Sequence, residues 1–479
     1  MLTKSNGMQG KVIVTTLESL MPQEHFLRDL NRLVNFSFIY GKVKHLYSTI
    51  GRPSVDPVVL IKMLLIGFLY GIDSERKIEK EVQVNIAFRW FLGIDLDENV
   101  PDHSTISQTR RRKLKDTDIF EEMFAEIVKK CIDVGLVDGS LILTDSTHIK
   151  ASASTHRAEM KTVTVEPRAY IKKLEQLCQE DDLKIRAQGI EAGKKKCGIA
   201  RNEKPKTKTI LVSTTDPDSG IMSRPDKPRG FHYLNHQSTD AKSGIITDVF
   251  VTPGNVNDNV PYVGRIKHQK GKLGLPIKEV GADKGYDFVE IHKEMLDLGI
   301  RTYITPYTRE TKRINDTYPP AAFHYDFEKD CFTCPNGAEL TLLCINQSQR
   351  LRVYAASRKS CKTCELFKKC IGGQRKTRQL SVPYFDREAR LQRENYRTPR
   401  YYEVQRLRRI YCEGNFALQK ENHNLRNTRK RGNKNVTEHC LFSALALNLK
   451  RLVKYLKANP EKTLLYRLFC TFSSQKAVA

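Results

Sequence analysis

Two short apolar runs that each lead to an aspartate constrain the fold of this chain most. Residues 141–143 predict a buried strand, since the run is too brief for a helix, and Asp145 follows as the run ends. A second run, residues 277–282, leads to Asp283 in the same way. The two carboxylates can meet only if their strands lie side by side in one sheet. The alternative is two ordinary strand-end turns, where aspartate is common.

A third feature is a strongly basic helical segment, residues 402–431. Within it, Arg409, Glu413 and Lys420 fall at spacings that would place them on one face of a regular helix. The same spacing adds Arg406, Phe416 and Ala417. Such a face can be a solvated ladder of salt bridges. The bases that follow Lys420 exceed what one glutamate could balance, so a polyanionic partner would suit the segment better.

Taken together, these segments resemble the DDE-type transposases of bacterial insertion sequences. The resemblance rests on TDST at Asp145, GADKGYD at Asp283, and a pattern of Arg409, three residues, Glu413, six residues and Lys420. It covers most of the chain. It implies an α+β fold built on an RNase H-like mixed sheet with flanking helices, in which Asp145, Asp283 and Glu413 are the catalytic acids.

The chemistry expected of such a triad is metal-dependent cleavage and transfer of DNA strands. Two Mg²⁺ (or Mn²⁺) ions can activate the attacking oxygen and stabilise the leaving oxygen. We expect Asp145 to bind both ions, while Asp283 and Glu413 each complete one site. Three acids this close repel one another, so the metal-free site should be partly disordered or protonated. The resemblance also implies that a homodimer or larger oligomer pairs two DNA ends.

Bases near the triad are expected to bind DNA. Arg409 and Lys420 are placed to hold phosphates of the transposon end, which lends affinity more than sequence choice. Relatives often carry a tyrosine three residues before the motif arginine, whereas this chain has Arg406. A role of that tyrosine in handling the DNA end is therefore in question for this chain.

Composition agrees with a nucleic-acid partner. The chain has 81 Lys and Arg against 55 Asp and Glu, a net charge of +26, which favours double-stranded DNA or another polyanion. No stretch approaches the apolar length needed to span a bilayer, and no secretory signal is evident. We expect a cytoplasmic, nucleoid-associated bacterial protein, whose 12 Cys are reduced or bind metal.

Residues 1–130 are expected to form a helical N-terminal DNA-binding domain. A turn at residues 101–104 precedes a long helix, residues 106–131, which Thr105 can cap. The bases early in this helix are Arg110, Arg111, Arg112 and Lys113. A turn followed by an arginine-rich helix suits a helix-turn-helix reader. A helical bundle with one solvated basic face explains the pattern equally well, and the family resemblance favours DNA binding.

The remaining chain divides into a split core and two insertions. Residues 135–310 would form the first part of the RNase H-like core, interrupted by a charged insertion at 155–207 that is either a phosphate-binding arm or a surface loop. Residues 311–400 form a Cys-rich insertion. Residues 401–460 complete the core and carry the Glu413 helix.

Strands within the core are expected in the RNase H-like order. Residues 209–217, 230–240 and 244–254 have strand character, and the last two are predicted to form a hairpin. The polar residues after this hairpin would cap a helix. Residues 301–306 can add the fifth strand, after the strand that bears Asp283.

Two CxxC pairs in the Cys-rich insertion have the spacing of a tetrahedral zinc site. The candidate ligands are Cys331, Cys334, Cys361, Cys364 and Cys370. Cys370 or Cys344 could replace one ligand of the two pairs. The alternative is a set of free thiols in a small β module. Neither interpretation gives the metal a catalytic role, since no His or water-activating Glu stands at the required spacing.

Two other functions fit the same motifs. One is an RNase H-like metal-dependent DNA nuclease that cuts without joining, and the other is a catalytically inactive DNA-binding derivative. The presence of all three acids and both helix bases weighs against the second. An ATP-driven motor is excluded by the absence of a GxxxxGK[ST] loop.

Overall fold

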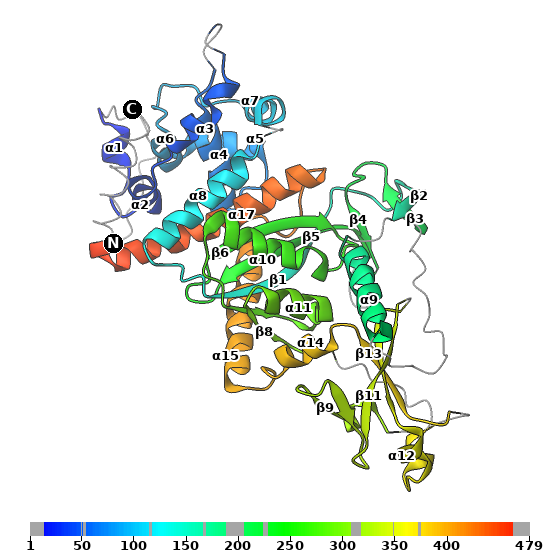
Figure 1. Ribbon diagram of the computed structural model, residues 1–479. Helices are drawn as coiled ribbons and strands as arrows, with labels where there is room; N and C mark the ends of the chain where they lie inside the picture. Colours follow the sequence, from blue (N-terminus) through cyan, green and yellow to red (C-terminus); the bar gives the residue numbers. More distant parts are fainter. Residues whose placement is uncertain are drawn as a thin grey trace, which may run out of the picture.

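The structure is a computed structural model in which a mixed sheet separates a helical N-terminal unit from a Cys-rich β module (Figure 1). The described residues are 14–48, 50, 54–114, 117–165, 169–187, 206–223, 229–307, 318–347, 349–371 and 375–462. Parts of the charged insertion, residues 166–168 and 188–205, lie outside this description. No helix among the described residues is both long and apolar enough to cross a membrane.

The central sheet has the RNase H-like strand order predicted from the sequence. Strand β1 (Leu141–Lys150) pairs antiparallel with β5 (Gly230–Asp240), and the other edge of β5 pairs with both β4 (Gly220–Met222) and β6 (Ile246–Pro253). On its other side, β1 pairs in parallel with β7 (Glu279–Ala282), which pairs in parallel with β8 (Arg301–Ile304).

Strand β1 is longer than the apolar run at 141–143 indicated. It continues to Lys150 because its second half pairs with β5, so Asp145 lies within the strand and not at its exit. The parallel pairing with β7, however, stops at Leu143, opposite Gly281. Asp145 therefore lies where the sheet opens beyond the end of β7, and a carboxylate there is accessible to the solvent side of that edge.

Helices cover both faces of this sheet. Leu141 and Leu143 pack against helix α15 (Pro399–Arg408), whereas Ile142 points into the main core on the other face of the sheet. This alternation places Asp145 on the α15 face. Helices on the Ile142 face include α10 (Asn259–Leu273) and α11 (Val289–Asp297). The C-terminal part of the core consists of α14 (Asp386–Arg393), α15 (Pro399–Arg408), α16 (Gly414–Asn422) and α17 (Asn433–Ala458).

The N-terminal unit is helical, as predicted. Its helices are α1 (Leu17–Leu20), α2 (Phe26–Leu33), α3 (Phe38–Val43), α4 (Pro57–Leu69), α5 (Glu75–Val84), α6 (Ile86–Leu92), α7 (His103–Thr109) and α8 (Ile119–Asp133). The expectation of one helix over 106–131 is wrong. Helix α7 starts earlier, where the Asp102 side chain and not Thr105 accepts from the Ser104 N–H at 2.6 Å, and a π-helical turn, Arg110–Leu114, precedes the separate α8.

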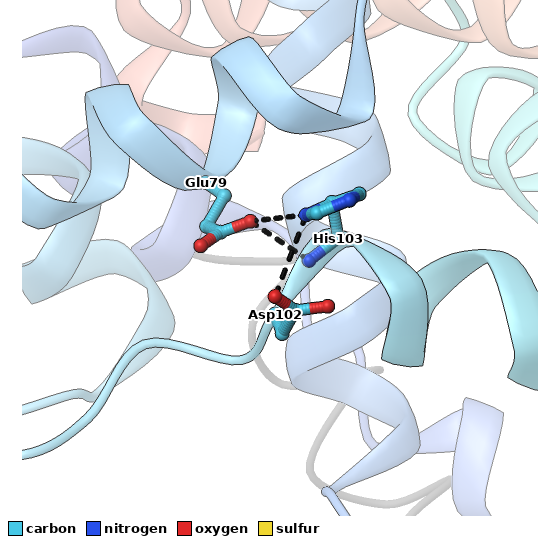
Figure 2. A group of neighbouring side chains, drawn as sticks. All are labelled: Glu79, Asp102 and His103. Carbon is cyan, nitrogen blue, oxygen red and sulfur yellow. Dashed lines mark hydrogen bonds and ion pairs between the residues drawn. The ribbon is translucent and has the colours of Figure 1, made fainter.

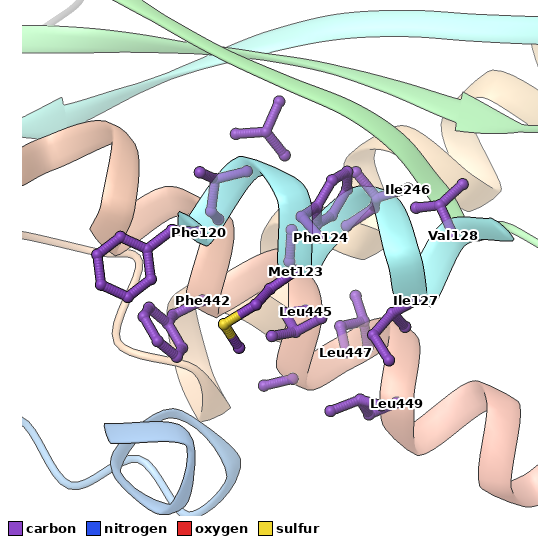
Figure 3. Packing of buried hydrophobic residues seen from close by; sticks show 14 of the residues in the cluster. Phe120, Met123, Phe124, Ile127, Val128, Ile246, Phe442, Leu445, Leu447 and Leu449 are labelled. Carbon is purple, nitrogen blue, oxygen red and sulfur yellow. The ribbon is translucent and has the colours of Figure 1, made fainter. Parts of the chain in front are cut away.

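Helix α17 joins the N-terminal unit to the central sheet. Its apolar side chains meet those of α8 and Ile246 of β6 in one continuous core (Figure 3). Phe442 stacks on Phe68 of α4 with ring centroids 5.4 Å apart, and it lies 5.3 Å from the ring of Phe120. The sequence suggested that this closing helix packs on the sheet, and the structure shows that it also contacts the N-terminal helices.

The two insertions contact each other. In the charged insertion, β2 (Ala158–Val165) pairs with β3 (Lys206–Ser213) in a separate two-stranded sheet, so the predicted strand at 209–217 is not part of the central sheet. Helix α9 (Ala169–Ala187) packs through Leu174 and Cys178 on the Cys-rich module. That module has the strands β9 (His324–Asp326), β10 (Cys331–Thr333), β11 (Glu339–Asn346), β12 (Leu351–Ala356) and β13 (Gln379–Pro383), and the helices α12 (Arg358–Lys362) and α13 (Phe367–Cys370).

The shared core predicts that Phe442→Ala destabilises the N-terminal helices and the sheet together. Phe442 is 2% exposed, and truncating a buried phenylalanine costs about 3–5 kcal/mol. Denaturant unfolding followed by circular dichroism should show one transition at a lower midpoint. Leu418→Ala, on a side chain 41% exposed, is the matched control and should leave the midpoint nearly unchanged. Two transitions, with only the N-terminal helices lost early, would contradict a shared core.

Candidate active site

Asp145 and Asp283 meet because of the register of two parallel strands. Leu143 of β1 pairs with Gly281 of β7, and two residues further along each strand lie the two aspartates. The Asp283 side chain accepts from the Gly285 N–H at 2.8 Å, which fixes it at the start of a 3₁₀ turn. Gly281 is needed for close packing, because a Cβ there would lie 2.5 Å from Cγ1 of Val404 on α15.

Polar contacts hold the Glu413 segment against the same edge of the sheet. The Gln405 side chain of α15 donates to the carbonyl of Ala282, the last residue of β7, at 3.1 Å, and to that of Tyr303 in β8 at 2.8 Å. Gln419 of α16 and Gln237 of β5 exchange two amide hydrogen bonds of 3.0 Å, and both side chains are buried. Gln237 is the partner of Asp145 in the β1–β5 register. The helix is therefore fixed directly beside Asp145.

Arg408, which the sequence pattern did not single out, bridges two of the three candidate acids. Its guanidinium donates to Asp145 Oδ2 at 2.7 Å and to Glu413 Oε1 at 3.2 Å. The reason is a π-helical turn, Arg409–Glu413, between α15 and α16. This turn widens the helix, so residues five apart lie on one face and the regular-helix spacing used above does not hold. Arg409 is exposed to solvent instead.

The environment of Asp145 raises the pKa of its carboxyl group. Burial raises the pKa of this carboxyl to about 6, and the negative charges of Asp283 and Glu413 also raise it, while Arg408 and the Ser146 N–H lower it. The upward shift agrees with the expectation that the metal-free site is partly protonated. Arg408 supplies a counter-charge that the sequence pattern did not indicate.

A fourth carboxylate, Asp258, lies beside the triad. Ser146, next to Asp145 in sequence, donates from its hydroxyl to Asp258 Oδ1 at 2.7 Å. Tyr286 is 1% exposed, and its hydroxyl has no hydrogen-bond partner among the described residues. Burial raises the pKa of Tyr286, and the charges of Asp258, Asp145 and Asp283 raise it further. The sequence placed Asp258 among the polar residues expected to cap the helix after the hairpin. It is the N-cap residue of α10, but its side chain makes no capping hydrogen bond.

Lys420 reaches the active-site face of β1. Its Nζ donates to Thr147 Oγ1 at 2.6 Å. Thr147 is two residues from Asp145, so the two side chains leave the strand on the same face. The structure therefore brings Lys420 close to the acids, as the sequence motif suggested, but through a contact with β1.

The bases of the N-terminal unit differ in their surroundings. Arg110 is an internal residue, because its guanidinium pairs with Glu75 of α5 and lies 3.6 Å from Glu438 of α17. Arg111 and Arg112 are exposed on the π-helical turn. Of the three predicted DNA-binding arginines, two face solvent and one holds helices together.

A compact group of possible metal ligands, Glu79, Asp102 and His103, lies in the same unit (Figure 2). His103 Nδ1 is 2.7 Å from Glu79 Oε2 and 3.4 Å from Asp102 Oδ2, and its backbone N–H donates to Glu79 at 2.9 Å. Arg76 Nε donates to His103 Nε2 at 3.1 Å. With Nε2 accepting, Nδ1 carries the proton and donates to Glu79. The group therefore joins α5 to the start of α7 through hydrogen bonds that occupy its ligand atoms.

Four of the five candidate cysteines of the Cys-rich module line one small cavity. They are Cys334, Cys361, Cys364 and Cys370. Burial raises the pKa of the Cys370 thiol, and the other three sulfurs raise it further, while Arg378 lowers it. Cys331 is buried on β10, with Glu339, Asp326 and Asp330 as its charged neighbours.

Comparisons with known families identify the two ends of the chain. A family model described as a transposase domain matches residues 15–112, which comprise most of the N-terminal helices. A second model, described as a transposase DDE domain, matches residues 333–453, which include Glu413 and its helix. The chain belongs to the DDE-type transposases. No curated protein matches the sequence.

One solved structure is weakly similar to this transposase. It is the cryo-EM structure of the piggyBac transposase synaptic complex with hairpin DNA, with a TM-score of 0.37 and 8% sequence identity, covering 92% of this chain and 78% of that chain. A TM-score at this level does not support a conclusion about shared fold or function. The strand order of the central sheet and the two family matches carry the assignment.

The bridge made by Arg408 predicts that this residue competes with metal ions. At pH 8, Arg408→Ala should bind Mn²⁺ several-fold more tightly than wild type, because a positive charge in contact with two ligand carboxylates is removed. Arg409→Ala, its exposed neighbour, should change the affinity little. Isothermal titration calorimetry measures both. Equal affinities in the two variants would show that Arg408 does not oppose the ions.

The raised pKa of Asp145 predicts pH-dependent metal binding. Protons compete with metal once the pH falls below about 6, so the Mn²⁺ affinity at pH 5 should be roughly tenfold lower than at pH 8. Above pH 7 the affinity should level off, because the carboxylate is then fully ionised. The titration is repeated with Asp145→Asn, in which this pH dependence should disappear. An affinity that is the same in wild type at pH 5 and pH 8 would contradict the assignment.

Proposed function

We propose that this transposase binds the terminal repeats of an insertion sequence in double-stranded DNA and catalyses metal-dependent strand cleavage and transfer. The observation that carries the proposal is the convergence of Asp145, Asp283 and Glu413, from three distant segments, at one edge of the sheet. Three contacts support this convergence: the parallel register of β1 and β7, the hydrogen bonds between Gln237 and Gln419, and the contact of Arg408 with Asp145. The DDE domain match includes the glutamate segment.

The residues of the site fit divalent ions with oxygen ligands. Carboxylate oxygens are the ligands that Mg²⁺ and Mn²⁺ prefer, and the unpartnered Tyr286 hydroxyl lies among the same acids. Asp145, between the other two, would contact both ions, and Asp283 and Glu413 would each complete one site. Two bound ions would supply an activated attacking oxygen and stabilise the leaving oxygen.

The protein's own groups would orient the DNA and balance charge. Arg408, displaced from Asp145 and Glu413, would be free to pair with a phosphate of the strand being cut. Lys420 and the exposed Arg409 would hold phosphates near the same edge. Asp258 would position Ser146 and, through it, the backbone beside Asp145. We expect Arg111 and Arg112 to contact DNA from the N-terminal unit, with Arg110 in a structural role.

The DNA substrate indicates the oligomeric state and the cellular location that we expect. Two element ends must be paired for transposition, so we propose a homodimer or larger assembly on DNA. We also propose that the protein acts in the bacterial cytoplasm, at the nucleoid. Its net charge of +26 favours such an association with DNA.

Cleavage of a labelled duplex that carries the element's own terminal repeat tests the triad. Asp145→Ala, Asp283→Ala and Glu413→Ala should each lower the Mg²⁺-dependent cleavage rate by about 100-fold or more, because each removes a metal ligand. Binding of the duplex should persist. Glu421→Ala, an exposed acid on the same helix as Glu413, should cut at the wild-type rate. Equal cutting by the triad variants and wild type would refute the proposed centre.

Joined products separate a transposase reaction from simple cleavage. With wild-type protein, a labelled 3′ end should appear covalently attached to an unlabelled target duplex. Cleavage without such products would favour the DNA nuclease, and binding without either product would favour a catalytically inactive DNA-binding derivative.

A further inference from the structure

The four cysteines around the cavity of the Cys-rich module are not used by the proposed reaction. Cys334 follows β10, Cys361 lies in α12, Cys364 follows α12, and Cys370 ends α13. Cys361 and Cys370 are 8% and 9% exposed. These four sulfurs from separated segments match the ligand number and type of a structural zinc site. No three of them lie within 4.8 Å of one another, so a bound Zn²⁺ would draw them closer together.

Cys331 does not belong to this set, although it forms a CxxC pair with Cys334. Successive side chains of β10 point to opposite faces, and Phe332 lies in the module's core together with Cys361 and Cys370. Cys331 therefore faces away from the cavity. Cys334 packs against the same core as Phe332. The structure thus selects four ligands from five candidates that the sequence spacing could not separate.

The backbone around Cys334 and Cys361 has turns suited to hold sulfur ligands. The Ala338 N–H donates to Cys334 Sγ at 3.3 Å, and Cys334 N–H donates to the Ala338 carbonyl at 2.9 Å. Gly337, with φ +78°, makes this turn possible. The Cys364 N–H donates to the Cys361 carbonyl at 3.3 Å. Backbone N–H groups directed at sulfur stabilise a metal-bound thiolate.

A cation beside the cavity balances the charge of the set. Arg378 lines the same cavity and donates to the carbonyls of Cys370 and Tyr318, each at 2.9 Å. Four thiolates around Zn²⁺ carry a net charge of −2, and a nearby guanidinium offsets one of these two negative charges. Arg378 also joins α13 to the start of the module through these two bonds.

The surface of α12 and α13 and of the residues after them is strongly basic. Its exposed cations are Arg358, Lys359, Lys362, Lys368, Lys369, Arg375 and Lys376. Between residues 358 and 376 the sequence holds a single acid, Glu365. These cations lie on and beside α12 and α13. Cys361 and Cys370 belong to these two helices, and Cys334 directly follows strand β10. Figure 1 shows α12 at the end of the molecule away from the N-terminal helices.

We propose that Cys334, Cys361, Cys364 and Cys370 bind one Zn²⁺, which fixes α12 and α13 so that their cations form a surface for DNA phosphates. The zinc site stands on the module's own geometry. The DNA contact rests on the proposed function and adds to it a second phosphate-binding surface, remote from the N-terminal unit. Such contacts contribute affinity irrespective of base sequence.

Zinc content of the purified full-length protein tests the metal site without any DNA. Wild type should contain one zinc per chain by inductively coupled plasma mass spectrometry, and Cys364→Ser and Cys334→Ser should lose it. Cys331→Ala is the matched control and should retain it. Co²⁺ exchanged into wild type should give the absorption of a tetrahedral four-thiolate site. Zinc-free wild-type protein that takes up no Co²⁺, or loss of zinc in Cys331→Ala equal to that in Cys364→Ser, would overturn the assignment.

DNA affinity measured against salt tests the basic surface. The double variant Lys368→Ala/Lys369→Ala should keep its zinc, bind DNA several-fold more weakly, and show a log–log salt slope smaller by about 2, since each phosphate contact contributes about 0.9. Lys129→Ala/Lys454→Ala removes the same charge from exposed positions elsewhere and should leave the slope unchanged. Equal slopes in the two double variants would overturn the DNA contact.

Comparing two DNA duplexes distinguishes a failure of this inference from a failure of the proposed reaction. A duplex with the terminal repeat and a scrambled duplex of equal length should lose affinity equally in Lys368→Ala/Lys369→Ala. If wild type binds both duplexes and cuts neither, the proposed catalysis fails while the zinc and phosphate contacts stand. If it cuts normally and the basic surface contributes nothing, the inference fails alone.

Discussion

Mutual repulsion among acidic side chains in a partly buried place is the constraint on which the active site depends. Asp145 is mostly withdrawn from water, and burial together with Asp283 and Glu413 raises its pKa to about 6. Arg408 offsets this repulsion by contacting Asp145 and Glu413 at once. Our proposal is that metal ions replace the Arg408 guanidinium beside these carboxylates when they bind.

The surrounding fold keeps these acids in place through neutral contacts. Parallel pairing of β1 with β7 sets the two aspartates side by side, and Gly281 lets α15 approach the sheet. The Gln237–Gln419 amide pair fixes α16 next to Asp145 without adding charge. Behind the sheet, α17 shares one core with the N-terminal helices. The N-terminal unit is thus connected to the sheet that carries the acids through a packed interior.

Much of this arrangement could be predicted from the sequence. The apolar runs before Asp145 and Asp283 predicted two neighbouring strands, and turn patterns predicted the hairpin of β5 and β6. The predicted strand at 209–217 was wrongly expected in the same sheet, because β3 pairs only with β2. The bridge that Arg408 makes between Asp145 and Glu413 could not be predicted. A regular helical repeat places Arg409 on the face of Glu413, and only the π-helical turn brings Arg408 to it. Only the structure shows that Arg110 pairs with an internal glutamate while Arg111 is exposed. Likewise, only the alternation of side chains along β10 shows that Cys331 faces away from the cavity that Cys334 lines. Such distinctions depend on tertiary packing, which a single sequence does not show.

The central claim is that the three acids form one metal centre which Arg408 closes when metal is absent. Anomalous diffraction from crystals of the protein grown with Mn²⁺ tests it most directly. We predict Mn²⁺ between Asp145, Asp283 and Glu413, with the Arg408 guanidinium moved away from Asp145. Mn²⁺ bound only elsewhere, for example at Glu79 and Asp102, with Arg408 still bridging Asp145 and Glu413, would contradict the account.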